Sequence, residues 1–202
     1  MSTLRSRSLF LSLVLCLIVT FGFGQDYYSI HEVRVSGLPS LVSRTPDPSD
    51  VLLTSLDTIL HDREICCAKD SALEDSAQRA DPASLKDVAV KLQGRHLLSD
   101  GRPIQVTAQY TEADKINSGL LITTLQAKHA LLMQWDSRLY VCYGATYRED
   151  FDPNSGTQTY AILTLLLLDT RYSDARREIV FDRARDDWSK VQGVLSLNFI
   201  PQ

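Results

Sequence analysis

Residues 160–168 constrain the fold of this chain most, because they are apolar at nearly every position. The run is too short to cross a membrane, which takes roughly 20 apolar residues in a helix. A short apolar run of this kind, bounded by polar chain, is typical of a strand that is covered on both faces. We therefore predict a strand here, with other parts of the chain packed against both of its sides.

Other segments show the signature of half-buried strands, in which apolar and polar residues alternate. Ile30, Val33 and Val35 indicate a short leading strand before the proline-rich stretch that follows. The connection Asp136-Ser137-Arg138 is short enough to join two antiparallel neighbours. The remaining predicted strands are residues 104–110, 130–135, 139–147, 177–181 and 195–199.

Helical periodicity dominates the part of the chain between the leading strand and residue 94. Helices are predicted at residues 50–62, from 66 toward 79, and from 85 to 93, with one more at 118–128. Ser84 precedes the third helix and is a good N-cap, and Gly94 suits its C-terminal end. These patterns predict one α+β domain over residues 50–202, with N-terminal helices followed by an antiparallel sheet of about five strands. Residues 25–49 are its leading strand and linker.

The first 24 residues have the three parts of a cleavable signal peptide. Arg5 and Arg7 form the basic start, residues 9–19 are apolar, and small residues lead to Gly24. Cys16 lies in the middle of the apolar run and follows a leucine, which is the wrong place for a lipid-modified cysteine. We therefore expect a secreted or periplasmic protein with no membrane attachment after signal cleavage.

Charge and motif content exclude several function classes. The chain has 21 basic and 25 acidic residues and a formal net charge of −4. It has no long basic block, so nucleic-acid binding is not expected. It also has no phosphate-cradling glycine loop and no second cysteine pair at zinc-binding spacing. We expect neither a cofactor nor a metal ion.

Three cysteines remain after signal cleavage, namely Cys66, Cys67 and Cys142. An oxidising compartment favours disulfides, and a bond between adjacent cysteines forces a strained ring. The sequence therefore predicts a disulfide from Cys66 or Cys67 to Cys142, and leaves open which of the two takes part. The third cysteine is then a free thiol.

Cys67 has features of a reactive cysteine. It lies at the start of a predicted helix, where unsatisfied backbone N–H groups and the helix dipole favour the nucleophilic thiolate. Asp62, Glu64 and Asp70 oppose this effect. Buried, unreactive cysteine is the commoner case, and the residues alone favour it.

The segment Cys67-Ala68-Lys69-Asp70-Ser71-Ala72-Leu73 resembles the helix-opening Cys-Gly-x-x-Ala-Ala-Leu pattern of papain-like peptidases of the bacteriocin-leader-cleaving branch. Residues 131–144 resemble the hairpin that carries the histidine in that family. The resemblance covers roughly residues 49–147. It implies a papain-like arrangement and a peptide as the ligand.

The chain departs from this family at the position that matters most. Arg138 stands where the family's histidine opens the second strand, and a guanidinium cannot take a proton from a thiol near neutral pH. His129 is the nearest histidine. If the chain is a peptidase, Cys67 is its nucleophile and His129 its base. If it is not, the same cleft binds a peptide, Arg138 supplies a charge for a carboxylate, and Trp135 and Tyr140 belong to an aromatic binding face.

The leading hypothesis is thus an exported papain-like protein with weak or no peptidase activity that binds peptides. The alternative is a non-catalytic secreted module for binding or structure, tied by the disulfide to Cys142. A subunit of an envelope assembly is a third possibility, which requires a large exposed apolar patch.

Overall fold

The computed structural model describes residues 28–35, 51–62, 72–172 and 178–202 of the 202-residue chain. In this part of the chain, eight strands form one sheet in which every neighbouring pair is antiparallel. The strands are β1 (Tyr28–Arg34), β2 (Gly94–Leu97), β3 (Pro103–Glu112), β4 (Leu131–Trp135), β5 (Arg138–Asp152), β6 (Thr157–Leu168), β7 (Glu178–Asp182) and β8 (Val191–Pro201). The helices are α2 (Val51–Asp62), α3 (Ala72–Gln78), α4 (Leu85–Leu92) and α5 (Ser118–Gln126).

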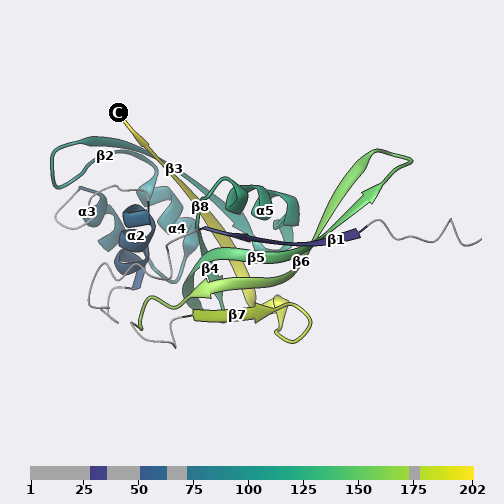
Figure 1. Ribbon diagram of the computed structural model, residues 1–202. Coiled ribbons are helices and arrows are strands. Elements are labelled where there is room, and N and C mark those ends of the chain that lie inside the picture. Colours follow the sequence, from purple (N-terminus) through teal and green to yellow (C-terminus); the bar gives the residue numbers. More distant parts are fainter. Residues whose placement is uncertain (1–27, 36–50, 63–71, 173–177) are drawn as a thin grey trace, which may run out of the picture.

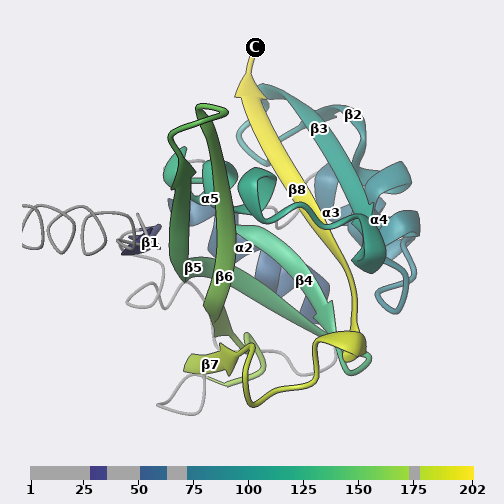
Figure 2. The same cartoon turned by 90° about the vertical axis from the view of Figure 1, so that its right-hand side faces the viewer.

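The helices lie on both faces of the sheet. The strand order is β2-β3-β8-β4-β5-β6-β7, and β1 pairs with the outer half of β5. Helices α2, α3 and α4 cover one face, whereas α5 covers the other, as comparison of Figure 1 with Figure 2 shows. A strand in the middle of this sheet therefore has helices on both sides.

Strand β6 confirms the prediction from its apolar run only in its C-terminal half. Leu165, Leu166, Leu167 and Leu168 are buried, and the side chains of consecutive strand residues point to opposite faces. Both faces are therefore covered there. The first three residues of β6 are exposed, because this end of the strand runs out beyond the helices.

The sheet is larger than the sequence predicted, so the prediction of about five strands is wrong, although the fold is still α+β. Strand β2 was not among the predicted strands. It has only four residues, and His96 is the one that is buried, so it shows no apolar alternation. Strand β1 joins the same sheet through β5. Helices also do not all come first, since α5 lies between β3 and β4.

The β4–β5 hairpin fixes the position of Arg138. Asp136 and Ser137 form its two-residue turn, with φ values of 49° and 60°. Two consecutive residues with positive φ are typical of the type I′ turn, whose twist matches that of the two strands. Trp135 and Arg138 are therefore paired directly across the hairpin, and Arg138 is the first residue of β5.

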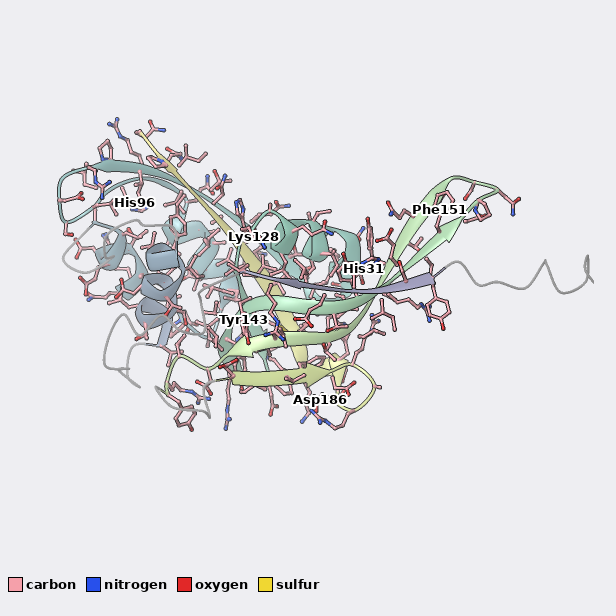
Figure 3. The ribbon with its side chains drawn as sticks, in the orientation of Figure 1. His31, His96, Lys128, Tyr143, Phe151 and Asp186 are labelled. Atoms are coloured by element: carbon pink, nitrogen blue, oxygen red, sulfur yellow. The ribbon has the colours of Figure 1, made fainter. Side chains whose placement is uncertain are left out.

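At the end of β5 and β6 that is far from the β4–β5 turn, these two strands extend past β4, β7 and β8. Strand β1 pairs with this part of β5 as far as Asp150. This projecting hairpin is plain in Figure 1, and Figure 3 labels Phe151 near its tip. The strands predicted here end at residue 147 and begin again at residue 160, but pairing continues to Asp152 and Thr157. We call β1 together with residues 148–160 of β5 and β6 the arm.

None of the helices in the described ranges is long and apolar enough to cross a membrane.

The N-cap of α4 gives a direct test of the helix assignment. The Ser84 hydroxyl accepts a hydrogen bond from the backbone N–H of Asp87 at 3.2 Å, as the sequence predicted. We expect Ser84→Ala to lower the free energy of unfolding by about 1 kcal/mol, because it leaves an N–H of the first turn without its acceptor. Urea unfolding measures this. Ser84→Thr keeps the hydroxyl acceptor and is the control. If the alanine and threonine variants were equally stable, the hydroxyl would not stabilise the helix as an N-cap.

Candidate functional site

A cleft of about 490 Å³ opens beside the turn of the β4–β5 hairpin. Its walls come from the first turn of α2, the end of α3 with the turn after it, the hairpin, and the segment that follows β6. The volume is in the range of small-molecule and peptide-end sites. The lining residues are Val51, Leu52, Ala77, Gln78, Ala80, Pro82, Ala83, Ser137, Arg138, Leu139 and Arg171.

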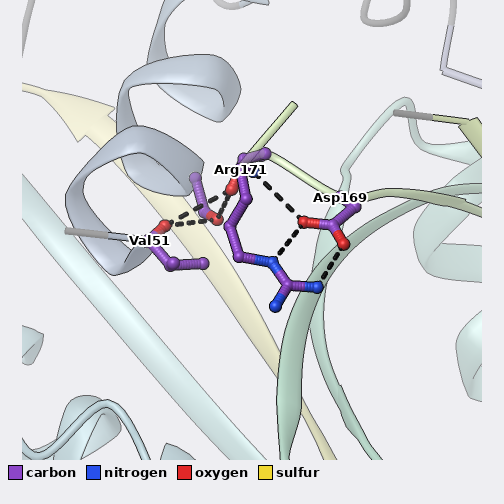
Figure 4. A network of polar contacts seen from close by, with 5 residues as sticks. Val51, Asp169 and Arg171 are labelled. Carbon is purple, nitrogen blue, oxygen red and sulfur yellow. Dashed lines mark hydrogen bonds and ion pairs between the residues drawn. The ribbon is translucent and has the colours of Figure 1, made fainter. Parts of the chain in front are cut away.

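Arg171 is held in place by Asp169. The Asp169 carboxylate is 2% exposed and accepts two hydrogen bonds from the guanidinium, one from Nε at 2.8 Å and one from Nη2 (Figure 4). It also accepts the backbone N–H of Arg171 at 3.1 Å. These bonds raise the pKa of Arg171 above its usual value. The charge of Arg171 is therefore both fixed in position and offset by its partner.

A second set of hydrogen bonds connects residues 169–171, the segment after β6, to helix α2. The Ser55 hydroxyl donates to the carbonyl oxygen of Val51 at 2.7 Å and lies 2.9 Å from the hydroxyl of Thr170. Ser55 and Thr170 are both buried. The first turn of α2 and the segment after β6 thus form one connected wall of the cleft (Figure 4).

Arg138 also lines the cleft, but its environment differs from that of Arg171. Its side chain is exposed. Burial raises the pKa of Tyr140, so the hydroxyl stays neutral at physiological pH, although the positive charge of Arg138 near that hydroxyl favours a lower pKa. In the described ranges no carboxylate forms an ion pair with Arg138, in contrast to the pair at Arg171.

The structure brings together the three residues that the sequence predicted for binding, but with different roles. Trp135 is half-buried, and its ring centroid is 5.7 Å from that of Tyr140 and 4.9 Å from that of Phe181. Tyr140 is 3% exposed. Neither Trp135 nor Tyr140 lines the cleft. They form the packed support behind Arg138, which alone of the three reaches the cleft.

The predicted catalytic pair is not assembled by the described residues, because Cys67 lies outside them. His129 is half-buried between α5 and β4, and its backbone N–H bonds to the carbonyl oxygen of Thr124 at 3.1 Å. The roles of Cys67 and His129 remain predictions. Among the described residues no three His, Cys, Asp or Glu side chains gather as a metal site.

Cys142 is a free thiol in the core of the sheet. It is fully buried, and this burial raises its pKa to about 12. The predicted disulfide to Cys66 or Cys67 is therefore not shown, and the other two cysteines lie outside the described residues.

Sequence reasoning missed Asp169, Thr170 and Arg171. The available signal was an acidic and a basic residue two positions apart, directly after an apolar strand. Such a spacing favours an ion pair at the strand end, but it does not indicate which element the pair faces.

Comparison with known proteins gives little further information. No protein-family model matches the chain, and no curated protein matches it. The chain is similar to the solved structure of UfSP from C. elegans, with a TM-score of 0.34 and 11% sequence identity, over 76% of this chain and 29% of that one. This is a weak structural similarity. It assigns neither the fold nor an activity, and the bacteriocin-leader-cleaving branch is not confirmed.

The state of Cys142 can be tested by alkylation. With a thiol pKa of about 12, Cys142 stays protonated in the folded chain, and burial also blocks the reagent. We expect no labelling of native protein between about pH 7 and 9, where an ordinary thiol with a pKa of about 8.5 reacts. Mass spectrometry should find Cys142 labelled after unfolding without a reductant. A requirement for the reductant would instead support the disulfide predicted from the sequence.

Proposed function

We propose that this chain is an exported binding protein whose cleft takes a peptide segment with a carboxylate next to an apolar side chain. The observation that supports it is Arg138, an exposed guanidinium at the cleft that lacks a carboxylate partner among the described residues. A guanidinium offers parallel N–H donors that match the two oxygens of a carboxylate. Export rests on the signal peptide predicted at residues 1–24.

The local charge favours an anion although the whole chain is acidic. The lining of the cleft includes two arginines and no aspartate or glutamate. Asp169 forms an ion pair with Arg171 and offsets its charge. The remaining positive charge of the lining is therefore that of Arg138. A positive site on a chain with a net charge of −4 distinguishes anionic ligands from cationic ones.

The rest of the lining selects an apolar neighbour for the carboxylate. Leu52, Leu139, Pro82 and the alanines after α3 supply aliphatic surface, while Gln78 and Ser137 are the neutral polar residues. Burial of one leucine-sized side chain stabilises a complex by roughly 1.5–3 kcal/mol before other terms are counted. A carboxyl terminus and an aspartate or glutamate side chain both fit this chemistry.

Binding to peptide pairs that differ in one group tests the proposal. Fluorescence anisotropy of short labelled peptides ending in leucine should show tighter binding for the free acid than for the amide. An amidated peptide with an internal aspartate next to leucine tests the side-chain source of the carboxylate. We expect Arg138→Gln to weaken binding of the preferred carboxylate at least tenfold, on the order of the 1.5–3 kcal/mol typical of charge-assisted hydrogen bonds.

The matched control for this experiment is Arg95→Gln, which removes an exposed arginine on β2 that does not line the cleft. It should bind like the unmodified chain. Equal affinity for acid and amide peptides, or unchanged binding by the Arg138 variant, would overturn the proposed function.

Tyr140 acts through Arg138 and gives a second test. Tyr140→Phe keeps the ring against Trp135 but removes the hydroxyl beside the Arg138 guanidinium. We expect roughly two- to tenfold weaker binding of carboxylate peptides, as for the loss of one hydrogen bond, and no change for amides. An equal loss of affinity for acid and amide peptides would indicate a general packing defect. It would contradict the role of Tyr140 in positioning Arg138.

A further inference from the structure

We propose that the tip of the arm of one copy binds in the cleft of a second copy, so that copies associate head to tail. This inference rests on the proposed function of the cleft and names a ligand for it. The partner copy contributes Phe151 and Asp152, which supply the apolar side chain and the carboxylate.

The arm tip has the form of a ligand. Residues 151–159 are all exposed, and the arm projects away from the helices (Figures 1 and 3). Phe151 is 48% exposed, although it is a large aromatic residue near the tip of a hairpin. Exposed aromatic residues on a projection are common anchors of protein interfaces. Tyr28 and Ile30 on β1 add exposed apolar surface along the same arm.

Asp152 gives the tip a carboxylate with a fixed orientation. It accepts hydrogen bonds from the backbone N–H of Asn154 at 2.9 Å and from the hydroxyl of Ser155 at 2.7 Å. These bonds lower the pKa of Asp152, so it is ionised at neutral pH. No cation pairs with it in the part of the chain that the structure describes, whereas Asp150 pairs with Arg148 at 3.0 Å. The carboxylate of Asp152 therefore complements the guanidinium of Arg138, which has no carboxylate partner among the described residues.

Strand β6 separates the tip from the cleft of the same copy. Its first residue, Thr157, is at the arm, and Asp169 follows its last residue, Leu168, beside the cleft. At about 3.3 Å per residue, the two ends are roughly 35–40 Å apart. One copy therefore cannot fill its own cleft. Contact between two different surfaces is heterologous, and it leads to open chains or rings of copies.

Sedimentation velocity on the full signal-cleaved chain tests this association. A hairpin tip buries little surface, so we expect weak binding, with a dissociation constant on the order of 0.1 mM. The weight-average sedimentation coefficient should rise with concentration up to about 1 mM. Phe151→Ser and Arg138→Gln should each stay monomeric, and Arg95→Gln should associate like the unmodified chain. Circular dichroism checks that each variant is folded.

Mixing the two deficient variants gives the sharpest result. The Phe151 variant has an intact cleft and the Arg138 variant has an intact tip, so an equimolar mixture should form dimers and nothing larger. A mixture that stays monomeric, association that survives either substitution, or an unmodified chain that is monomeric at about 1 mM would each overturn the inference. If association fails while Arg138 still discriminates carboxylate peptides from amides, the proposed function stands. If both fail, the proposed function fails too.

Discussion

Asp169 determines how the cleft is built, because the buried carboxylate that follows β6 must be paired. Its oxygens accept three N–H groups of Arg171, so the chain turns sharply after β6 and the guanidinium is held at the cleft. Thr170, between the two, bonds to Ser55 and so attaches this turn to α2. Removing one partner of such a pair leaves an uncompensated charge, which is far more costly than the net stabilisation from the pair itself. The hydrogen bonds of residues 169–171 therefore connect the end of β6, helix α2 and the wall of the cleft.

The two arginines at the cleft differ for this reason. Arg171 is a structural cation whose charge is offset by Asp169, whereas Arg138 has no carboxylate partner among the described residues. The type I′ turn places Arg138 at the start of β5, where it lines the cleft beside the packed pair of Trp135 and Tyr140. Under the proposed function, a carboxylate ligand pairs with the Arg138 guanidinium and not with that of Arg171. The arm, at the far end of β5 and β6, carries the complementary chemistry in Phe151 and Asp152.

Much of the local structure could be predicted from the sequence, because it depends on neighbouring residues. The cap at Ser84 and the hairpin turn at Asp136 and Ser137 are of this kind. Strand β2 could not be predicted, since it is stabilised by pairing with β3 and not by any pattern of its own. In the arm, the aspartates, asparagine and glycine indicated a loop, although the strands continue through Asp152 and Thr157.

The candidate site was only half predictable. Arg138, Trp135 and Tyr140 are close in sequence and share one hairpin, so their proximity followed from the strand prediction. Asp169 and Arg171 could not be assigned to the cleft, because the wall they form requires contact between Thr170 and Ser55, which are 115 positions apart. No local pattern encodes that contact.

The central claim is that Arg138 is available to a carboxylate and Arg171 is not. Nuclear magnetic resonance of the arginine Nε–H groups tests it directly, with each signal assigned by substitution. Addition of a carboxylate peptide should shift the Arg138 signal and leave that of Arg171 in place, and the Arg171 proton should exchange slowly with water. If Arg138 does not respond, or if the two protons exchange at the same rate, the account of the cleft is wrong.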